Sequence, residues 1–361
     1  MKTNYSKNFN PNNYSFTAGE LNNKKVIWIS FPYDKNLISE LRNAVKAYWN
    51  PAYKKWYVTD NKHYRNLFNI EVDYIGNSAQ EITPINLEEL NRFINELKLK
   101  AYSPNTIKTY SSEFIQLLKI IKNYPVKDLT PEKIKAYLLY CIQTLKLSEN
   151  AIHSRMNAVK FYFEKVLHQE KMFLNIPRPK KPSTLPKAIS TKDIKKMLEQ
   201  IENLKHQLLL KICYGMGLRV SELVNLKITD IDSNRMQVHI RAGKGKVDRY
   251  AILPDSILED LRKYYRIYKP KDYLFEGQHG GQYSVRSVQQ VFKNAMNKAK
   301  INKKVGIHSL RHSYATHLIE QGTDIRFVQE LLGHKNIKTT MIYTGLTDAT
   351  KRKIKSPLDN L

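Results

Sequence analysis

The chain has 361 residues, a length that predicts two or three domains, and its 60 Lys and Arg outnumber its 33 Asp and Glu to give a formal net charge of +27. This excess of positive charge predicts a polyanionic partner and favours nucleic acid over an anionic membrane surface. No apolar run approaches the roughly 20 residues that span a bilayer, and the first residues lack the apolar stretch of a signal peptide, so we expect no membrane association.

Residues 1–80 predict a small α+β module. Residues 26–31 are β-branched and aromatic and predict a strand, apolar residues at helical spacing follow over 37–45, and residues 56–58 predict a second strand. Its tryptophans, Trp28, Trp49 and Trp56, are interpreted as core residues in preference to a base-stacking platform. Because the module is also rich in lysine, an accessory DNA-binding role stays open.

Residues 83–175 predict a domain made of helices alone. Ser103 followed by proline, Thr130 followed by proline, and Ser148 are typical helix starts, and apolar residues recur at helical spacing after each of them. Four amphipathic helices with basic outer faces would suit a bundle that grips a DNA backbone. A solvated basic face is the alternative for any single side chain here.

Residues 176–188 predict a basic linker, since four prolines forbid a helix. It would connect domains that close around a duplex, and an ordinary spacer is an equal alternative. Together with basic residues elsewhere, it supplies the candidate DNA contacts, which are Lys108, Arg155, Lys160, Arg178, Lys180, Lys181, Arg241 and Lys246.

Residues 189–361 predict a mixed domain. Helices are expected from Ser190, through the apolar run at 208–214, over 254–268 and 284–300, and over two segments that end at Gly322 and Gly333. Alternating strands over 235–240 and 247–253 are joined by residues 241–246, a glycine-containing hairpin turn. The whole chain is therefore predicted to be mainly α with a small β component.

Two arginines in this domain are candidates for holding a phosphate. Arg219 follows the glycines that end an apolar helix, and Glu222 could orient it; a purely structural Arg–Glu pair is preferred when this motif is taken alone. His308 and Arg311 share one helix face at spacing i, i+3, near a helix N-terminus that favours anions. His312 is placed on another face and interpreted as structural, as is His317.

The histidines and cysteines do not predict a metal site. No carboxylate or cysteine accompanies the histidines at ligand spacing. Cys141 and Cys213 lie in apolar stretches, which favours a reduced, cytoplasmic setting over a disulfide framework. We therefore expect neither a metal nor another cofactor.

Three further residues complete the candidate chemistry. Lys244 stands between two glycines on the hairpin turn and could protonate a leaving oxygen. Lys246 is an alternative candidate for this role. His334, taken alone, is only a polar loop residue. Tyr343 is one of 23 tyrosines, and a phenol is a poor nucleophile until a base or a positive field assists it. Surrounding cations would supply that field, and attack on a DNA phosphate would store the broken bond's energy in a phosphotyrosyl link, without ATP.

Taken in order, these motifs closely resemble the signature of the tyrosine recombinases, the phage integrase and Xer-type family. The motifs are Gly217-Leu-Arg219-Val-Ser-Glu222-Leu, Gly243-Lys244-Gly245, His308-Ser-Leu-Arg311-His312, Leu331-Leu-Gly-His334 and Ile342-Tyr343-Thr. They span roughly residues 190–345. Residues 83–174 are similar to the family's core-binding domain in pattern only, and the first 80 residues look like an added module.

The resemblance implies that the protein is a site-specific recombinase, or integrase, from a phage, another mobile element or a chromosome-dimer resolution system. It also implies a role for each of the candidate residues. Tyr343 would form a 3′-phosphotyrosyl intermediate while Arg219 and Arg311 clamp the phosphate. Lys244 would be the general acid and His308 would assist proton transfer at Tyr343. His334 would hydrogen-bond the phosphate, and Glu222 matches a supporting position.

The implied partners are double-stranded DNA and three further copies of the chain, in a tetramer that passes through a Holliday junction. DNA-bending helper proteins are an open addition. A type IB topoisomerase-like enzyme is the alternative function, because it shares this chemistry without pairing two sites. A basic DNA-binding protein with incidental catalytic groups is a third interpretation, which the intact motif set argues against.

Overall fold

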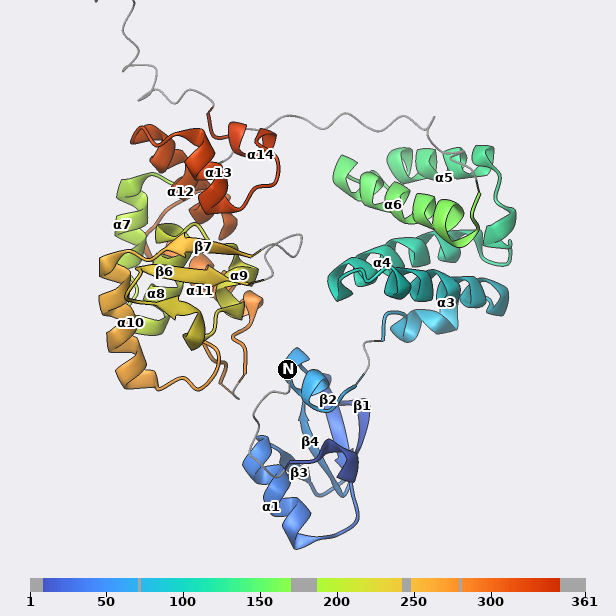
Figure 1. The fold of residues 1–361 in the computed structure, drawn as a ribbon. Helices are drawn as coiled ribbons and strands as arrows, with labels where there is room; N and C mark the ends of the chain where they lie inside the picture. The colour runs from blue at the N-terminus through green and yellow to red at the C-terminus, as the bar shows by residue number, and fades with distance from the viewer. Residues whose placement is uncertain (1–8, 71–72, 170–186, 242–247, 279–280, 345–361) are drawn as a thin grey trace, which may run out of the picture. The chain divides into compact units, whose positions relative to one another are not determined.

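The computed structural model describes residues 9–70, 73–169, 187–241, 248–278 and 281–344 (Figure 1). Helices dominate these residues and two small antiparallel sheets accompany them, as the sequence predicts. None of the helices within the described ranges combines the length and the apolar character that crossing a bilayer requires.

The N-terminal module, residues 9–70, contains more strands than predicted. The expected strand, helix and strand are β2 (Lys24–Ser30), α1 (Lys35–Ala44) and β4 (Lys55–Thr59), and α2 (Lys62–Leu67) follows them. Two strands were not predicted, β1 (Ser15–Leu21) and β3 (Tyr48–Asn50), and the sheet order is β1-β2-β4-β3. β1 and β2 form a hairpin whose turn residues, Asn22 and Asn23, both have positive φ, the backbone that suits a two-residue hairpin turn.

The module's tryptophans are only partly core residues. Trp28 is buried, as expected, but Trp49 is 48% exposed. Trp49 pairs across β3 and β4 with Trp56, whose ring centroid lies 5.5 Å away, and the Arg42 guanidinium lies over the Trp56 ring. The interpretation of all three as core residues is therefore wrong for Trp49.

The helical segment, residues 76–169, begins its helices where the sequence predicts. It comprises α3 (Pro84–Leu99), α4 (Pro104–Ile121), α5 (Pro131–Gln143) and α6 (Glu149–Phe161), which continues as a π-helical turn over Tyr162–Val166. The side chains of Ser103, Thr130 and Ser148 each accept a hydrogen bond from a first-turn backbone N–H. Phe93 and Phe114 stack at 4.5 Å within the apolar core of this bundle.

Basic residues on these helices differ in their surroundings. Lys108 is exposed, as expected, and Lys160 is half-buried and lies 3.5 Å from Glu164. Arg155 is only 7% exposed, and its Nε donates to Glu113 across 2.9 Å. The expectation that Arg155 lies on the outer face is therefore wrong, because its guanidinium forms an interior ion pair between α4 and α6.

The C-terminal segment, residues 187–344, packs helices around a three-stranded sheet. Its strands are β5 (Ile231–Asp232), β6 (Gln237–Ile240) and β7 (Arg249–Ile252), antiparallel in the order β5-β6-β7. Its helices are α7 (Thr191–Glu199), α8 (Leu204–Gly215), α9 (Val220–Asn225), α10 (Asp255–Tyr268), α11 (Val285–Lys298), α12 (His308–Glu320), α13 (Ile325–Leu332) and α14 (Lys338–Met341). The predicted helices and both predicted strands are present, and β5 and α14 are additional.

Several sequence predictions fall outside the described residues. These are the linker residues Arg178, Lys180 and Lys181, the hairpin residues Lys244 and Lys246, and the tail after residue 344. Arg241, at the end of β6, is half-exposed and its Nε lies 2.6 Å from Asp230.

Arg155→Met tests whether this arginine stabilises the fold or binds DNA. The change leaves the Glu113 carboxylate without its partner, so we expect the free energy of unfolding to fall by about 1–3 kcal/mol. Thermal unfolding followed by circular dichroism measures the loss. In the control, the exposed Lys108→Met should stay within about 0.5 kcal/mol of the wild type.

Below its melting temperature, Arg155→Met should bind DNA as tightly as the wild type. Unchanged melting together with weakened DNA binding would instead restore Arg155 as a DNA contact.

Candidate active site

Arg219 is positioned by a glycine turn and a helix cap. α8 ends at Gly215, and Gly217 then has φ +59°, a conformation in which a Cβ atom would also overlap the Tyr314 ring. Arg219 is the N-cap of α9, and its backbone N–H donates to the Glu222 carboxylate across 2.9 Å. The turn therefore fixes where the Arg219 side chain leaves the backbone.

Glu222 is a buried carboxylate shared by arginines. It is 6% exposed and accepts hydrogen bonds from Arg219 Nη1 at 2.5 Å and from both terminal nitrogens of Arg249 at 3.0 and 2.7 Å. Arg311 Nη1 lies 3.8 Å from it. Burial alone would raise the pKa of Glu222, but the bonds from Arg249 and Arg219 outweigh it and lower the pKa to about 2.

Arg311 lies in the interior and is held by two backbone carbonyls. Its side chain is on α12, it is 1% exposed, and it donates to Gly217 O at 2.7 Å and to Leu332 O at 2.5 Å. Burial and the nearby Arg219 lower its pKa to about 9, with Glu222 acting in the opposite direction. Arg311 is therefore a charged donor at neutral pH, fixed between the α8–α9 turn and the end of α13.

His334 follows the left-handed residue that ends α13. Gly333 has φ +62°, and a Cβ there would lie 2.8 Å from Cδ of Arg249. The Nε2 atom of His334 lies 3.1 Å from Arg311 Nη2, and its Nδ1 lies 2.9 Å from Thr340 Oγ1. Burial and the arginines lower the pKa of His334 to about 4. Because arginine can only donate, we assign Nε2 as the acceptor and place the ring proton on Nδ1, facing Thr340.

Tyr343 is buried in its own chain. It is 5% exposed and packs with Ala315, Val328 and Leu332. Its Oη lies 2.8 Å from Nδ1 of His312, and its ring lies nearly parallel to that of His334 at 6.4 Å. Burial raises the pKa of Tyr343, although Arg311 and Arg219 act to lower it. The resting phenol is therefore protonated.

The α12 histidines differ from the sequence interpretation. His312 was expected on another face as a structural residue, yet it is the histidine bonded to Tyr343. His308 lies exposed at the start of α12, with its ring centroid 4.7 Å from that of His312. Residues i and i+4 share a helix face as i and i+3 do, so His308, Arg311 and His312 lie together. His317 is structural, as expected, with Nδ1 2.9 Å from the Tyr214 hydroxyl.

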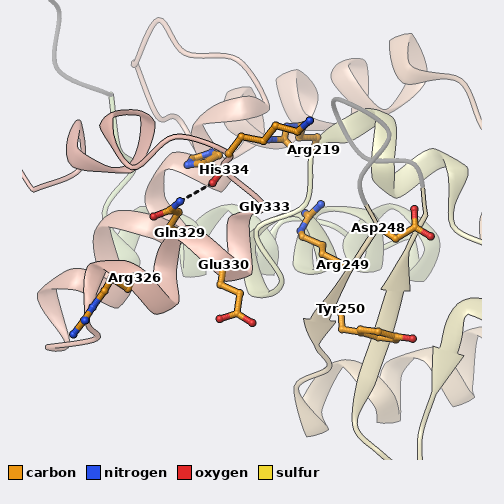
Figure 2. A pocket seen from close by; sticks show the side chains of 10 residues that line it. Arg219, Asp248, Arg249, Tyr250, Arg326, Gln329, Glu330, Gly333 and His334 are labelled. Atoms are coloured by element: carbon orange, nitrogen blue, oxygen red, sulfur yellow. Dashed lines mark hydrogen bonds between the residues drawn. The ribbon is translucent and has the colours of Figure 1, made fainter.

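A cavity of about 610 Å³ opens beside these groups (Figure 2). Arg219, Arg249 and His334 line one part of it, and Figure 2 shows the Gln329 amide bonded to the His334 backbone at 2.9 Å. Asp248, which precedes β7, also lines the cavity. The described part of the chain holds no cluster of three or more metal-ligating side chains.

The structure brings together Arg219, Glu222, Arg311, His334 and Tyr343 as a group, as the sequence predicts from their order. It adds Arg249, Thr340 and His312, which sequence reasoning missed as site residues. Lys244 lies outside the described residues.

Glu222→Gln tests the buried carboxylate. The folded-state pKa of Glu222 is lowered to about 2, so its charge stabilises the fold above the ordinary glutamate pKa. We expect the variant to lose about 3 kcal/mol at neutral pH, and the difference from the wild type to shrink as pH falls from about 4.5 toward 2. Urea unfolding at several pH values measures this difference. The matched change of exposed Glu259 to Gln should leave stability and its pH dependence unchanged, and equal behaviour of the two variants would contradict a stabilising role.

Comparison with known proteins identifies the family. Residues 187–350 match the family model described as Phage integrase family, and residues 90–171 match Phage integrase, N-terminal SAM-like domain. The tyrosine recombinase XerA of Pyrococcus horikoshii is 35% identical over 268 residues, covering 73% of this chain and 90% of that protein. A putative integrase/recombinase, y4qK, of Sinorhizobium fredii is 40% identical over 214 residues, covering 59% of this chain and 70% of that protein.

Solved structures agree with these relatives. XerH site-specific recombinase, in a post-cleavage complex with its difH substrate, is 25% identical, with a TM-score of 0.55, and the match covers 66% of this chain and 75% of XerH. A lambda integrase tetramer on a Holliday junction is 18% identical and shares the fold, with a TM-score of 0.60 over 88% of this chain and 96% of that one. These matches support a recombinase over the topoisomerase-like alternative. The chain therefore belongs to the phage integrase family and is a tyrosine-type site-specific recombinase.

Proposed function

We propose that this recombinase cuts and rejoins DNA through a 3′-phosphotyrosyl intermediate on Tyr343, and that neither a metal ion nor ATP takes part. The observation that carries the proposal is that separate parts of the sequence bring Arg219 and His334 to one cavity, with Arg311 bonded to His334 and the buried Tyr343 phenol close by. Three arginines share the single carboxylate of Glu222, so the site has an excess of positive charge that a phosphodiester would balance.

The two arginines are proposed to bind the non-bridging oxygens of the scissile phosphate. Charge-assisted donors stabilise the additional charge of the transition state, and they do so best when they need little reorganisation. Arg219 lines the cavity, while Arg311 is fixed behind it by two carbonyls. Glu222 and Arg249 would hold Arg219 in position.

His334 is proposed to hydrogen-bond the phosphate, and this requires a change from the resting arrangement. Its Nε2 accepts from Arg311, so it has no proton to give a phosphate oxygen. An incoming anion would turn the Arg311 donor toward itself and favour protonation of His334. The bond to Thr340 would keep the ring in place during that exchange.

Lys244 and His308 complete the proposal. Lys244, with Lys246 as a rival, would protonate the 5′-oxygen as it leaves. His308 lies exposed at the N-terminus of α12, where a phosphate is favoured, and would assist proton movement there.

Double-stranded DNA and further copies of the chain are the proposed partners. The net charge of +27 and the DNA-bound state of XerH support the first. A tetramer of two dimers is proposed for the second, since lambda integrase shares the fold and was solved as a tetramer on a Holliday junction. Residues 83–175 would be the core-binding domain, 176–188 a basic linker and 189–361 the catalytic domain. Lys108, Lys160 and Arg241 are described basic residues that we propose as DNA contacts.

Residues 1–80 are proposed to form an accessory module that contacts DNA. Basic side chains and the half-exposed Trp49 support this role. A cytoplasmic setting is also part of the proposal, since the proposed substrate is DNA. DNA-bending helpers are an open addition.

Tyr343→Phe tests the nucleophile. The substrate is recovered first, by mixing the wild type with DNA from both sides of its gene and sequencing fragments that stay attached in detergent. A nicked form of the recovered duplex then traps the covalent product. We expect Tyr343→Phe to bind this duplex but form no attachment, because the attacking oxygen is gone. Tyr265→Phe, at an exposed tyrosine of α10, should attach normally. Attachment by Tyr343→Phe would assign the reaction to another residue.

Arg219→Ala tests the phosphate clamp. Loss of one charged donor should slow covalent attachment by roughly 10²-fold or more, as with other lost transition-state donors, while DNA binding falls far less. Quenched time courses on the nicked duplex give the rate. Arg262→Ala, an exposed arginine of α10, provides the control. Equal rates for Arg219→Ala and the wild type would remove Arg219 from the clamp.

A further inference from the structure

We infer that His312 is the general base that takes the proton from Tyr343 when the phenol attacks DNA. The inference rests on the proposed function, because it assumes that Tyr343 is the nucleophile. It adds a catalytic residue that the sequence motifs had led us to treat as structural.

The contact itself is direct. Oη of Tyr343 and Nδ1 of His312 are 2.8 Å apart, a normal distance for a hydroxyl donating to an imidazole nitrogen. The ring of Tyr343 packs in the apolar cluster with Val328 and Leu332, and its backbone N–H donates to Thr340 O at 3.0 Å. The oxygen that would attack therefore begins within reach of a proton acceptor.

The other histidines are less suited to this step. Both ring nitrogens of His334 are engaged, one with Arg311 and one with Thr340. His308 is exposed one helical turn before His312, and its ring contacts that of His312 edge to face. His308 therefore borders His312, whereas it is the Nδ1 atom of His312 that lies 2.8 Å from the Tyr343 hydroxyl.

Electrostatics keep the resting pair neutral. Burial, His308 and Arg311 lower the pKa of His312 to about 4, while burial raises the pKa of Tyr343. The ionisable groups that act on this pair are His308 and Arg311 from α12, Arg219, and His334 beside the phenol ring. A neutral imidazole can accept a proton, and a protonated phenol stays unreactive until a phosphate arrives.

The proton then moves during bond formation. As Oη forms its bond to phosphorus, the phenol oxygen loses electron density and its hydrogen becomes acidic, so the proton passes to Nδ1. The bond from phosphorus to the 5′-oxygen breaks, and its electron pair goes to that oxygen, which takes a proton from the general acid. Rejoining reverses each transfer, with His312 returning its proton to Tyr343.

His312→Asn separates proton acceptance from simple hydrogen bonding. The asparagine oxygen lies near the position of Nδ1 and can hold the phenol, but it cannot take a proton at neutral pH. We expect covalent attachment to the nicked duplex to slow by about 10²–10⁴-fold with unchanged DNA binding. His317→Asn is the matched control, because His317 also lies on α12 and also bonds a tyrosine through Nδ1; its attachment rate should not change.

A more acidic phenol provides a readout that a structural role would not alter. A tyrosine with two ring fluorines at position 343 releases its proton more easily and depends less on a base. In the His312→Asn background it should raise the attachment rate roughly tenfold or more.

A second substrate separates the base from the general acid. A duplex with sulfur in place of the bridging 5′-oxygen needs no general acid. It should therefore restore the attachment rate of Lys244→Ala but not that of His312→Asn.

The outcomes are distinguishable. A wild-type attachment rate in His312→Asn overturns the inference, and so does a slow rate that the fluorinated phenol fails to improve. If the wild type attaches to no DNA at all, it is the proposed function that fails.

Discussion

The site depends on one buried carboxylate. Glu222 is bonded to Arg219 and Arg249 and lies 3.8 Å from Arg311, so it is the common anion of three cations that come from α9, β7 and α12. Buried charges are costly unless they are paired with opposite charges. Here the pairing is incomplete, because three positively charged arginines face one negatively charged carboxylate. The interior would therefore stabilise a second anion in the adjoining cavity. The ion pairs with Glu222 stabilise the fold, and the positive charge that remains would attract a phosphodiester.

Arginines also connect the ends of helices in this site. The last carbonyls of a helix have no partner within it, and Arg311 bonds the carbonyl of Leu332 at the end of α13 while Arg249 bonds that of Leu331 across 3.1 Å. Arg311 reaches the Gly217 carbonyl after α8 as well. Two glycines in left-handed conformation, Gly217 and Gly333, make these carbonyls accessible. The arginine positions thus follow from backbone geometry.

Sequence reasoning found what local chemistry determines. Helix caps such as Ser103 and Thr130, and the glycine that ends α13, lie where they were expected because each satisfies backbone groups within a few residues. Long-range contacts were not accessible in the same way. Arg249 looked like one more residue of an alternating strand, and only the fold brings it to Glu222. His312 was misassigned because its partner, Tyr343, lies 31 residues away in the sequence. The residues near His312 do not show against which face of α12 the segment with Tyr343 packs. The prediction that Arg155 lies on the outer face was wrong for the same reason, since its partner Glu113 belongs to another helix.

The position of Tyr343 bears on how the proposed nucleophile would reach the DNA. The ring is buried against its own chain and its hydroxyl is bonded to its own His312. Burial of an aromatic ring and one hydrogen bond together contribute about 2–4 kcal/mol, so moving Tyr343 to a neighbouring copy costs that much unless the neighbour offers an equal pocket. The short α14, tied to His334 through Thr340, leaves Tyr343 only two residues beyond a fixed helix. These constraints favour attack in cis. If each copy carries its own nucleophile beside its own base, the step that decides when cleavage occurs is the entry of the phosphate, because that anion changes the partners of Arg311 and His334 and makes the phenol's proton transferable.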